Sequence, residues 1–128
     1  MTSPEHTALV LLLEDDEDAA EAFAILLADW GYRCVRGPAL SPAAETLGGR
    51  LEAVAAIISD FHLAGGETGL DAVRRAATLG ARAPALLMTS SLRGAARRQV
   101  EAAGHRVMEK PADPRRIRAW LDLNLVAA

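Results

Sequence analysis

Carboxylate side chains follow two of the short apolar runs in this sequence. Glu14, Asp15 and Asp16 come directly after the stretch that ends at Leu13, and Asp60 comes shortly after a second stretch. Carboxylates that converge on one place repel each other unless a hard cation bridges them through oxygen ligands. These residue types therefore predict a Mg²⁺ site, provided that the fold brings the two segments together.

Two further polar residues follow apolar segments in the second half of the chain. Thr89 comes after the run 85–88, and Lys110 comes after the segment 106–109. A hydroxyl and an ammonium group can contact the oxygens of a phosphoryl group while a metal ion neutralises charge on the transferring oxygens. Together with the carboxylates, they predict a site for Mg²⁺ and a phosphoryl group.

Each of these residues also has a purely structural explanation. Acidic residues before a helix favour its dipole, Asp60 could form a loop, Thr89 could cap the next helix, and Lys110 could simply end a strand. The functional interpretation rests on the combination of complementary groups at four predicted strand ends.

The elements that would position these residues alternate between strands and helices. Several strands lack polar alternation, as is typical of strands buried on both faces of a parallel sheet. Such an order predicts an α/β fold with helices on both faces of the sheet, in which ligands bind beyond the carboxyl ends of the strands. The predicted strands are 8–13, 32–36, 54–58, 85–88 and 106–109, and the predicted helices are 17–30, 42–51, 69–79, 92–103 and 114–125.

Length and composition indicate one domain over residues 1–128, with 51% hydrophobic residues available for its core. The net charge of −3 argues against direct binding of nucleic acid. Cys34 is the single cysteine, so no internal disulfide is expected. Residues 1–7 do not read as a signal peptide, and the run 8–13 is too short to span a membrane, so we expect a soluble cytoplasmic protein.

The chain resembles the receiver domains of two-component response regulators over residues 9–125. The resemblance is carried by LLLEDD at 11–16, IISDFHL at 57–63, LLMTS at 86–90 and EKP at 109–111, and the segment 59–72 is most similar to receivers attached to hybrid histidine kinases. The resemblance implies a five-stranded parallel sheet with helices on both faces, the flavodoxin-like (βα)5 receiver fold with strand order 2-1-3-4-5.

The same resemblance assigns roles to the predicted site. Asp60 would be the phosphoacceptor, Thr89 the switch hydroxyl, and Lys110 the phosphoryl contact, followed by a cis peptide bond to Pro111. Mg²⁺ would be held by Asp15, by Asp60, by the backbone carbonyl of His62, and through water by Glu14.

The implied function is that of a signalling switch in a phosphorelay. A histidine kinase or a histidine phosphotransfer protein would dock near 19–23 and pass its phosphoryl group to Asp60, which would change the surface around the fourth and fifth helices. The chain would not be a turnover enzyme, because it would only accept the phosphoryl group and slowly lose it. It would act alone or as the receiver part of a hybrid kinase, since 128 residues leave no room for a DNA-binding output domain.

Two positions depart from the usual receiver pattern. Ala64 stands where many receivers have proline, and Gly65 and Gly66 follow it, which predicts a more mobile loop. Val107 stands three residues before the lysine, where many members carry an aromatic ring that turns inward as the hydroxyl moves. The usual aromatic coupling is therefore in doubt, while the phosphorylation chemistry is unaffected.

Three alternatives remain open. The chain could be a receiver-fold binding module that is never phosphorylated, or an Asp-nucleophile phosphohydrolase of the haloacid-dehalogenase type, although His62 stands where those enzymes place a second Asp. Nucleotide binding is disfavoured, because the glycines at 65–69 match no phosphate-binding motif.

The arginines of the last two helices form either a solvated face or a basic docking surface. They are Arg93, Arg97, Arg98, Arg115, Arg116 and Arg118.

Overall fold

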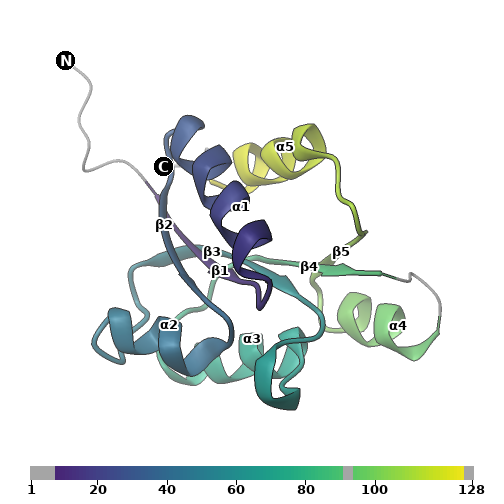
Figure 1. Ribbon diagram of the computed structural model, residues 1–128. Helices are drawn as coiled ribbons and strands as arrows, with labels where there is room; N and C mark the ends of the chain where they lie inside the picture. The colour runs from purple at the N-terminus through teal and green to yellow at the C-terminus, as the bar shows by residue number, and fades with distance from the viewer. Residues whose placement is uncertain (1–7, 91–93, 126–128) are drawn as a thin grey trace.

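The computed structural model describes residues 8–90 and 94–125 and has the predicted alternation of strands and helices (Figure 1). Its strands form one parallel sheet in the order β2-β1-β3-β4-β5, which confirms the predicted fold class and strand order. The elements are β1 (Leu9–Leu13), α1 (Glu17–Asp29), β2 (Arg33–Gly37), α2 (Leu40–Thr46), β3 (Val54–Asp60), α3 (Gly69–Thr78), β4 (Ala85–Thr89), α4 (Ala95–Ala102), β5 (Arg106–Glu109) and α5 (Pro114–Leu125).

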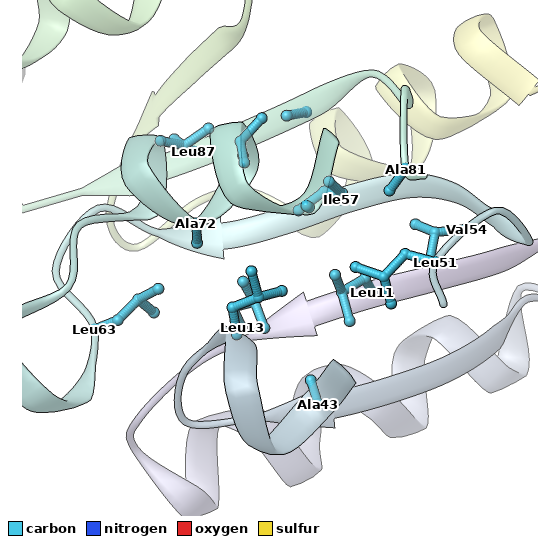
Figure 2. Packing of buried hydrophobic residues seen from close by; sticks show 14 of the residues in the cluster. Leu11, Leu13, Ala43, Leu51, Val54, Ile57, Leu63, Ala72, Ala81 and Leu87 are labelled. Atoms are coloured by element: carbon cyan, nitrogen blue, oxygen red, sulfur yellow. The ribbon is translucent and has the colours of Figure 1, made fainter. Parts of the chain in front are cut away.

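The helices form two layers, with α1 and α5 on one face of the sheet and α2, α3 and α4 on the other (Figure 1). Alternate side chains of each central strand therefore enter different cores. Leu11 and Ile57 pack with residues of α2 and α3 (Figure 2), while Leu12 and Ile58 pack with Leu27 of α1 and residues of α5. Because both faces of these strands are buried, their sequences show no polar alternation.

Local side chains fix where three helices begin. Oδ1 of Asp16 accepts hydrogen bonds from the backbone N–H groups of Asp18 and Ala19 at 3.0 and 3.2 Å, so Asp16 caps α1. Thr68 caps α3 in the same way. Asp113 accepts from the N–H of Arg115 at 2.9 Å, and α5 begins at Pro114, as the sequence predicted.

Some boundaries differ from the prediction. The helix expected over 42–51 is α2, which starts earlier and ends at Thr46, because Gly48 and Gly49 adopt φ of 70° and 79° and turn the chain away. Leu51 is instead fully buried in the core. Of the helix expected over 92–103, the structure has Ala95–Ala102, and the expected start at Leu92 lies outside the described residues.

Two of the strands that carry the candidate site, β3 and β4, are longer than predicted. β3 extends to Asp60 and β4 to Thr89, because the N–H of Phe61 donates to the carbonyl of Met88 and the N–H of Lys110 donates to that of Thr89, both at 2.8 Å. Asp60 is thus held in the ladder and is not a loop residue. Thr89 does not cap α4, whose N-cap is Gly94.

Within the described ranges, no helix is long and apolar enough to cross a membrane. The expected soluble, cytoplasmic character of the chain stays a prediction.

The start of α3 lies very close to the end of β3. A Cβ atom on Gly69 would overlap the carbonyl oxygen of Asp60 and lie 2.9 Å from Oγ of Ser59, which itself donates a hydrogen bond to that carbonyl at 2.7 Å. The N–H of Gly69 also donates to the carbonyl of Phe61 at 2.6 Å. Only a residue without a side chain fits between the helix and the strand.

We therefore predict that Gly69→Ala destabilises the protein. The overlap should cost about 1–3 kcal/mol, which outweighs the gain of up to about 1 kcal/mol that alanine has over glycine in a helix. Urea unfolding gives the free energies. Arg74→Ala, at an exposed position of the same helix, is the control and should change stability by at most about 0.5 kcal/mol. Equal effects of the two substitutions would contradict the packing argument.

Candidate functional site

The candidate site lies at the carboxyl ends of four neighbouring strands. Glu14 follows β1, Asp60 ends β3, Thr89 ends β4 and Lys110 follows β5. The backbone holds each of these positions, because the N–H of Glu14 donates to the carbonyl of Gly37 at 3.0 Å and the N–H groups that follow β3 and β5 continue the ladder to the carbonyls of Met88 and Thr89. The parallel sheet thus converts four distant sequence positions into one edge.

Three carboxylates converge on this edge. Glu14, Asp15 and Asp60 each offer an oxygen within 4.8 Å of those of the other two. Glu14 and Asp60 are only 5% and 4% exposed, whereas Asp15 is exposed to solvent. Oε2 of Glu14 accepts a hydrogen bond from the N–H of Asp16 at 3.1 Å, which orients that carboxylate. Asp16 itself belongs to the helix cap and not to this cluster.

Lys110 supplies the cation that faces the carboxylates. Its Nζ lies 2.7 Å from Oδ1 of Asp60 and 3.6 Å from Oε1 of Glu14. Burial alone would lower the pKa of Lys110, but the hydrogen bond and charge of Asp60, with the charge of Glu14, outweigh it, so the pKa is raised. The ammonium group is therefore kept charged beside Asp60.

The environment of Glu14 disfavours its charged form, in contrast to that of Lys110. Its pKa is raised from 4.5 to about 7, mainly by burial and also by the hydrogen bond and charge of Asp60, while the N–H of Asp16 and the Lys110 ammonium lower it by less. Three carboxylates thus share one nearby ammonium group, and a proton on Glu14 relieves part of the repulsion when no metal ion is present.

A shallow hollow of about 230 Å³ opens over Asp60. Thr89, although buried, and the exposed His62 line it, so the structure brings together all of the residue positions predicted for the site. The peptide bond between Lys110 and Pro111 is cis, as the resemblance implied. The other residues that line the hollow are Asp15, Phe61, Met88, Ser90 and Lys110.

The donor set fits Mg²⁺. Its side-chain groups are carboxylate oxygens, which a small hard cation prefers. Oδ1 of Asp60 is shielded from solvent and faces the Lys110 ammonium at 2.7 Å. An oxygen in that condition is suited to bind a cation. The residues that would hold the ion directly are Asp15 and Asp60, with Glu14 next to them.

Sequence reasoning missed two residues that support the site. The hydroxyl of Ser59 is fully buried and bonds the carbonyl of Asp60, and Glu67 connects the following loop to α2. Ser59 was visible only as a neighbour of Asp60, and no spacing rule relates Glu67 to residues 27 positions earlier. The loop expected to be mobile contains a short 3₁₀ turn at Ala64–Gly66, with φ of 75° at Gly65. Its mobility stays a prediction.

No family model matches the sequence, and no curated protein matches it. Solved structures do. The non-phosphorylated HemR receiver domain of Leptospira biflexa is 23% identical with a TM-score of 0.79, over 95% of this chain and 97% of that one. The chemotaxis protein CheY4 of Vibrio cholerae is 21% identical with a TM-score of 0.77, over 92% and 98%. A response regulator receiver protein of Burkholderia phymatum is 22% identical with a TM-score of 0.76, over 95% and 98%.

The chain therefore has the fold of response regulator receiver domains over nearly its whole length, as the sequence resemblance implied. At these identities the similarity establishes the fold but not the chemistry of the site.

The pKa of Glu14 predicts how stability depends on pH in the metal-free protein. A group whose pKa is higher in the folded state stabilises that state fully below its unfolded pKa, and this contribution is lost as the pH rises through the folded value. The free energy of unfolding in EDTA should thus fall between pH 4.5 and about 7. At about 1.4 kcal/mol per pKa unit, the loss is on the order of 2–3 kcal/mol.

Glu14→Gln removes this titration and provides the reference. The stability of the wild type minus that of the variant, measured by urea unfolding in EDTA, should decrease over the same pH range. A difference that stays constant from pH 4.5 to 7 would show that Glu14 ionises normally.

Proposed function

We propose that the chain is a phosphoacceptor switch of a two-component phosphorelay, in which Asp60 takes a phosphoryl group in a Mg²⁺-dependent reaction. The observation that carries the proposal is the contact at 2.7 Å between the Lys110 ammonium and a buried Asp60 carboxylate that belongs to a three-carboxylate cluster. A structural ion pair alone gives no reason to bury a second carboxylate, that of Glu14, beside it and to place a third, that of Asp15, within reach.

The transfer needs little covalent chemistry from the protein. A carboxylate oxygen of Asp60 attacks phosphorus, the bond from phosphorus to the donor histidine nitrogen breaks, and the electron pair stays on the imidazole, which later takes a proton from water. A bound Mg²⁺ would neutralise charge on the transferring oxygens. Lys110 would exchange its contact with the Asp60 carboxylate for one with a phosphoryl oxygen, and Thr89 would donate its hydroxyl to another.

The surroundings of the site support docking of a phosphohistidine donor. A second hollow, of about 200 Å³, lies between α1 and the loop after β5, and its lining is mainly apolar, with Glu14 and Lys110 at one side. Phe23 is half-buried there and Ala19 is exposed, whereas Ala20 is buried and belongs to the core. A histidine kinase or histidine phosphotransfer protein that covers this hollow would bring its histidine to Asp60. The apolar residues of its lining are Ala19, Phe23, Met88, Pro111, Ala112 and Ile117.

The output side is proposed around α4, β5 and α5, next to Thr89. Val107 is half-buried and fills the core on the α4 face, so the switch would operate without an aromatic rotor. Arg97 pairs with Glu101 and Arg115 with Asp113, which favours a solvated face over a dedicated docking surface at these two positions. Arg93 lies outside the described residues.

The alternatives have weaker support. His62 would have to serve as the general acid of a phosphohydrolase, and it is an exposed side chain that stacks edge-on against Phe61 at 5.0 Å. A binding module that is never phosphorylated would have no use for the buried carboxylates. We therefore propose phosphoryl acceptance with slow loss of the group, and no multiple-turnover activity.

Phosphorylation is tested by incubation with Mg²⁺ and acetyl phosphate, followed by intact-mass measurement. We expect a gain of one phosphoryl group, which is absent in Asp60→Asn and after chelation with EDTA. Glu109→Gln, a neighbouring acidic residue outside the cluster, is the control and should be phosphorylated normally. If acetyl phosphate is not a donor, beryllofluoride with Mg²⁺ should still stabilise the wild type, and failure of both tests would refute the proposal.

The metal site has a separate test in thermal unfolding. Mg²⁺ should raise the melting temperature by mass action, because it binds the folded state only. At 100 times the dissociation constant the gain is about 2.7 kcal/mol. Asp15→Asn should lose most of this gain, and Asp18→Asn, an acidic residue one helical turn away, should keep it. Retention of the full effect in Asp15→Asn would show that the metal ion binds elsewhere.

A further inference from the structure

Helix α2 obtains its N-terminal cap from a distant loop. Its N-cap residue is Ala39, which has no side-chain oxygen, and the N–H of Leu40 instead donates to Oε1 of Glu67 at 3.1 Å. Glu67 belongs to the loop that follows Asp60, and its side chain is only 14% exposed. A cap taken from 27 residues away joins two loops that the sequence keeps apart.

Arg75 holds Glu67 in this position. Its guanidinium group pairs with the second carboxylate oxygen of Glu67 and also donates to Oγ of Ser41 at 3.2 Å. Glu67 therefore contacts α2 directly and α3 through Arg75. We call Glu67 and Arg75, with the groups that they bond on Leu40 and Ser41, the α2–α3 clamp.

The two loops joined by the clamp lie next to the metal-binding groups: one follows β2 and contacts Glu14 through the backbone, and the other follows Asp60. On one side, the N–H of Ala64 donates to the carbonyl of Pro38 at 3.2 Å, and the preceding Gly37 accepts from the N–H of Glu14. The other side is the loop from Phe61 to Thr68, which contains the carbonyl of His62.

The loop after Asp60 is closed by hydrogen bonds between its two ends. His62 and Thr68 form an antiparallel bridge, and the N–H of Leu63 donates to the carbonyl of Glu67 at 2.9 Å. Because these bonds connect residues 62–63 with residues 67–68, we expect a displacement of Glu67 to shift His62 as well. The position of the His62 carbonyl relative to Glu14 then depends on whether the clamp is formed.

We infer that Glu67 is a positioning residue for the Mg²⁺ site, which couples occupancy of that site to the docking of α2. The inference rests on the proposed function, because it concerns the same metal ion. Since coupling between two sites is reciprocal, loss of the clamp should weaken Mg²⁺ binding, and Mg²⁺ should in turn strengthen the cap on α2.

The test measures two quantities for the full chain: the dissociation constant of Mg²⁺ by calorimetry, and the hydrogen-exchange protection of the Leu40 amide by NMR. In Glu67→Ala we expect Mg²⁺ to bind about 10-fold more weakly, at the low end of what loss of a supporting residue costs a metal site. Leu40 should exchange faster, and the increase in its protection on addition of Mg²⁺ to the wild type should disappear.

Two further variants separate coupling from general damage. Glu67→Gln keeps an oxygen for Leu40 but loses the charge that faces Arg75, so it should retain most of the amide protection and lose only part of the affinity. Glu52→Gln removes the exposed pair with Arg50, 3.4 Å apart, and should change neither quantity.

The outcomes are distinct. If the wild type binds Mg²⁺ and Glu67→Ala binds it equally well, Glu67 is only a helix cap and the inference is overturned, while the proposed function stands. If the wild type neither binds Mg²⁺ nor accepts a phosphoryl group, both proposals are overturned together.

Discussion

The repulsion among three carboxylates at one edge of the sheet is the constraint on which the rest of this structure depends. Glu14 and Asp60 are buried, and burial in a medium of low polarity makes like charges still more unfavourable. Lys110 offsets part of this repulsion, and a proton on Glu14 can offset more. A divalent cation bound to these carboxylates would offset the remaining repulsion, as the proposed metal-dependent switch requires.

The fold tolerates this arrangement because the sheet beneath it is rigid. β1 and β3 are covered on both faces by separate apolar cores, and their ends are fixed by ladder hydrogen bonds up to the site residues themselves. The backbone positions of Glu14 and Asp60 are therefore set by the sheet itself.

The loops are not independent of each other. Gly69 packs against the carbonyl of Asp60, and Glu67 reaches from the same loop to the start of α2. Such contacts give α2 and α3 a physical connection to the acidic edge that does not involve Val107, the position where an aromatic coupling residue is missing. In the proposed switch, a change at Asp60 would therefore reach α2 and α3 as well as α4, β5 and α5.

The class of fold could be predicted from the sequence, and so could the convergence of the candidate site residues at one edge of the sheet. Buried parallel strands leave unalternating apolar runs, and the groups at their ends converge because all parallel strands finish at one edge, so Asp60, Thr89 and Lys110 could be identified from local pattern alone. The boundaries of α2 were predicted wrongly, because its start is capped by Glu67 from a distant loop and its end is set by the positive φ angles of Gly48 and Gly49. Only the folded chain shows that Glu14 is buried while the neighbouring Asp16 caps a helix, and that Glu67 joins two loops. The burial of Glu14 and the contact of Glu67 depend on residues far apart in the chain, and no period or spacing in the sequence encodes such contacts. The hydrogen bond from Ser59 to Asp60 is local, but no sequence rule singles it out.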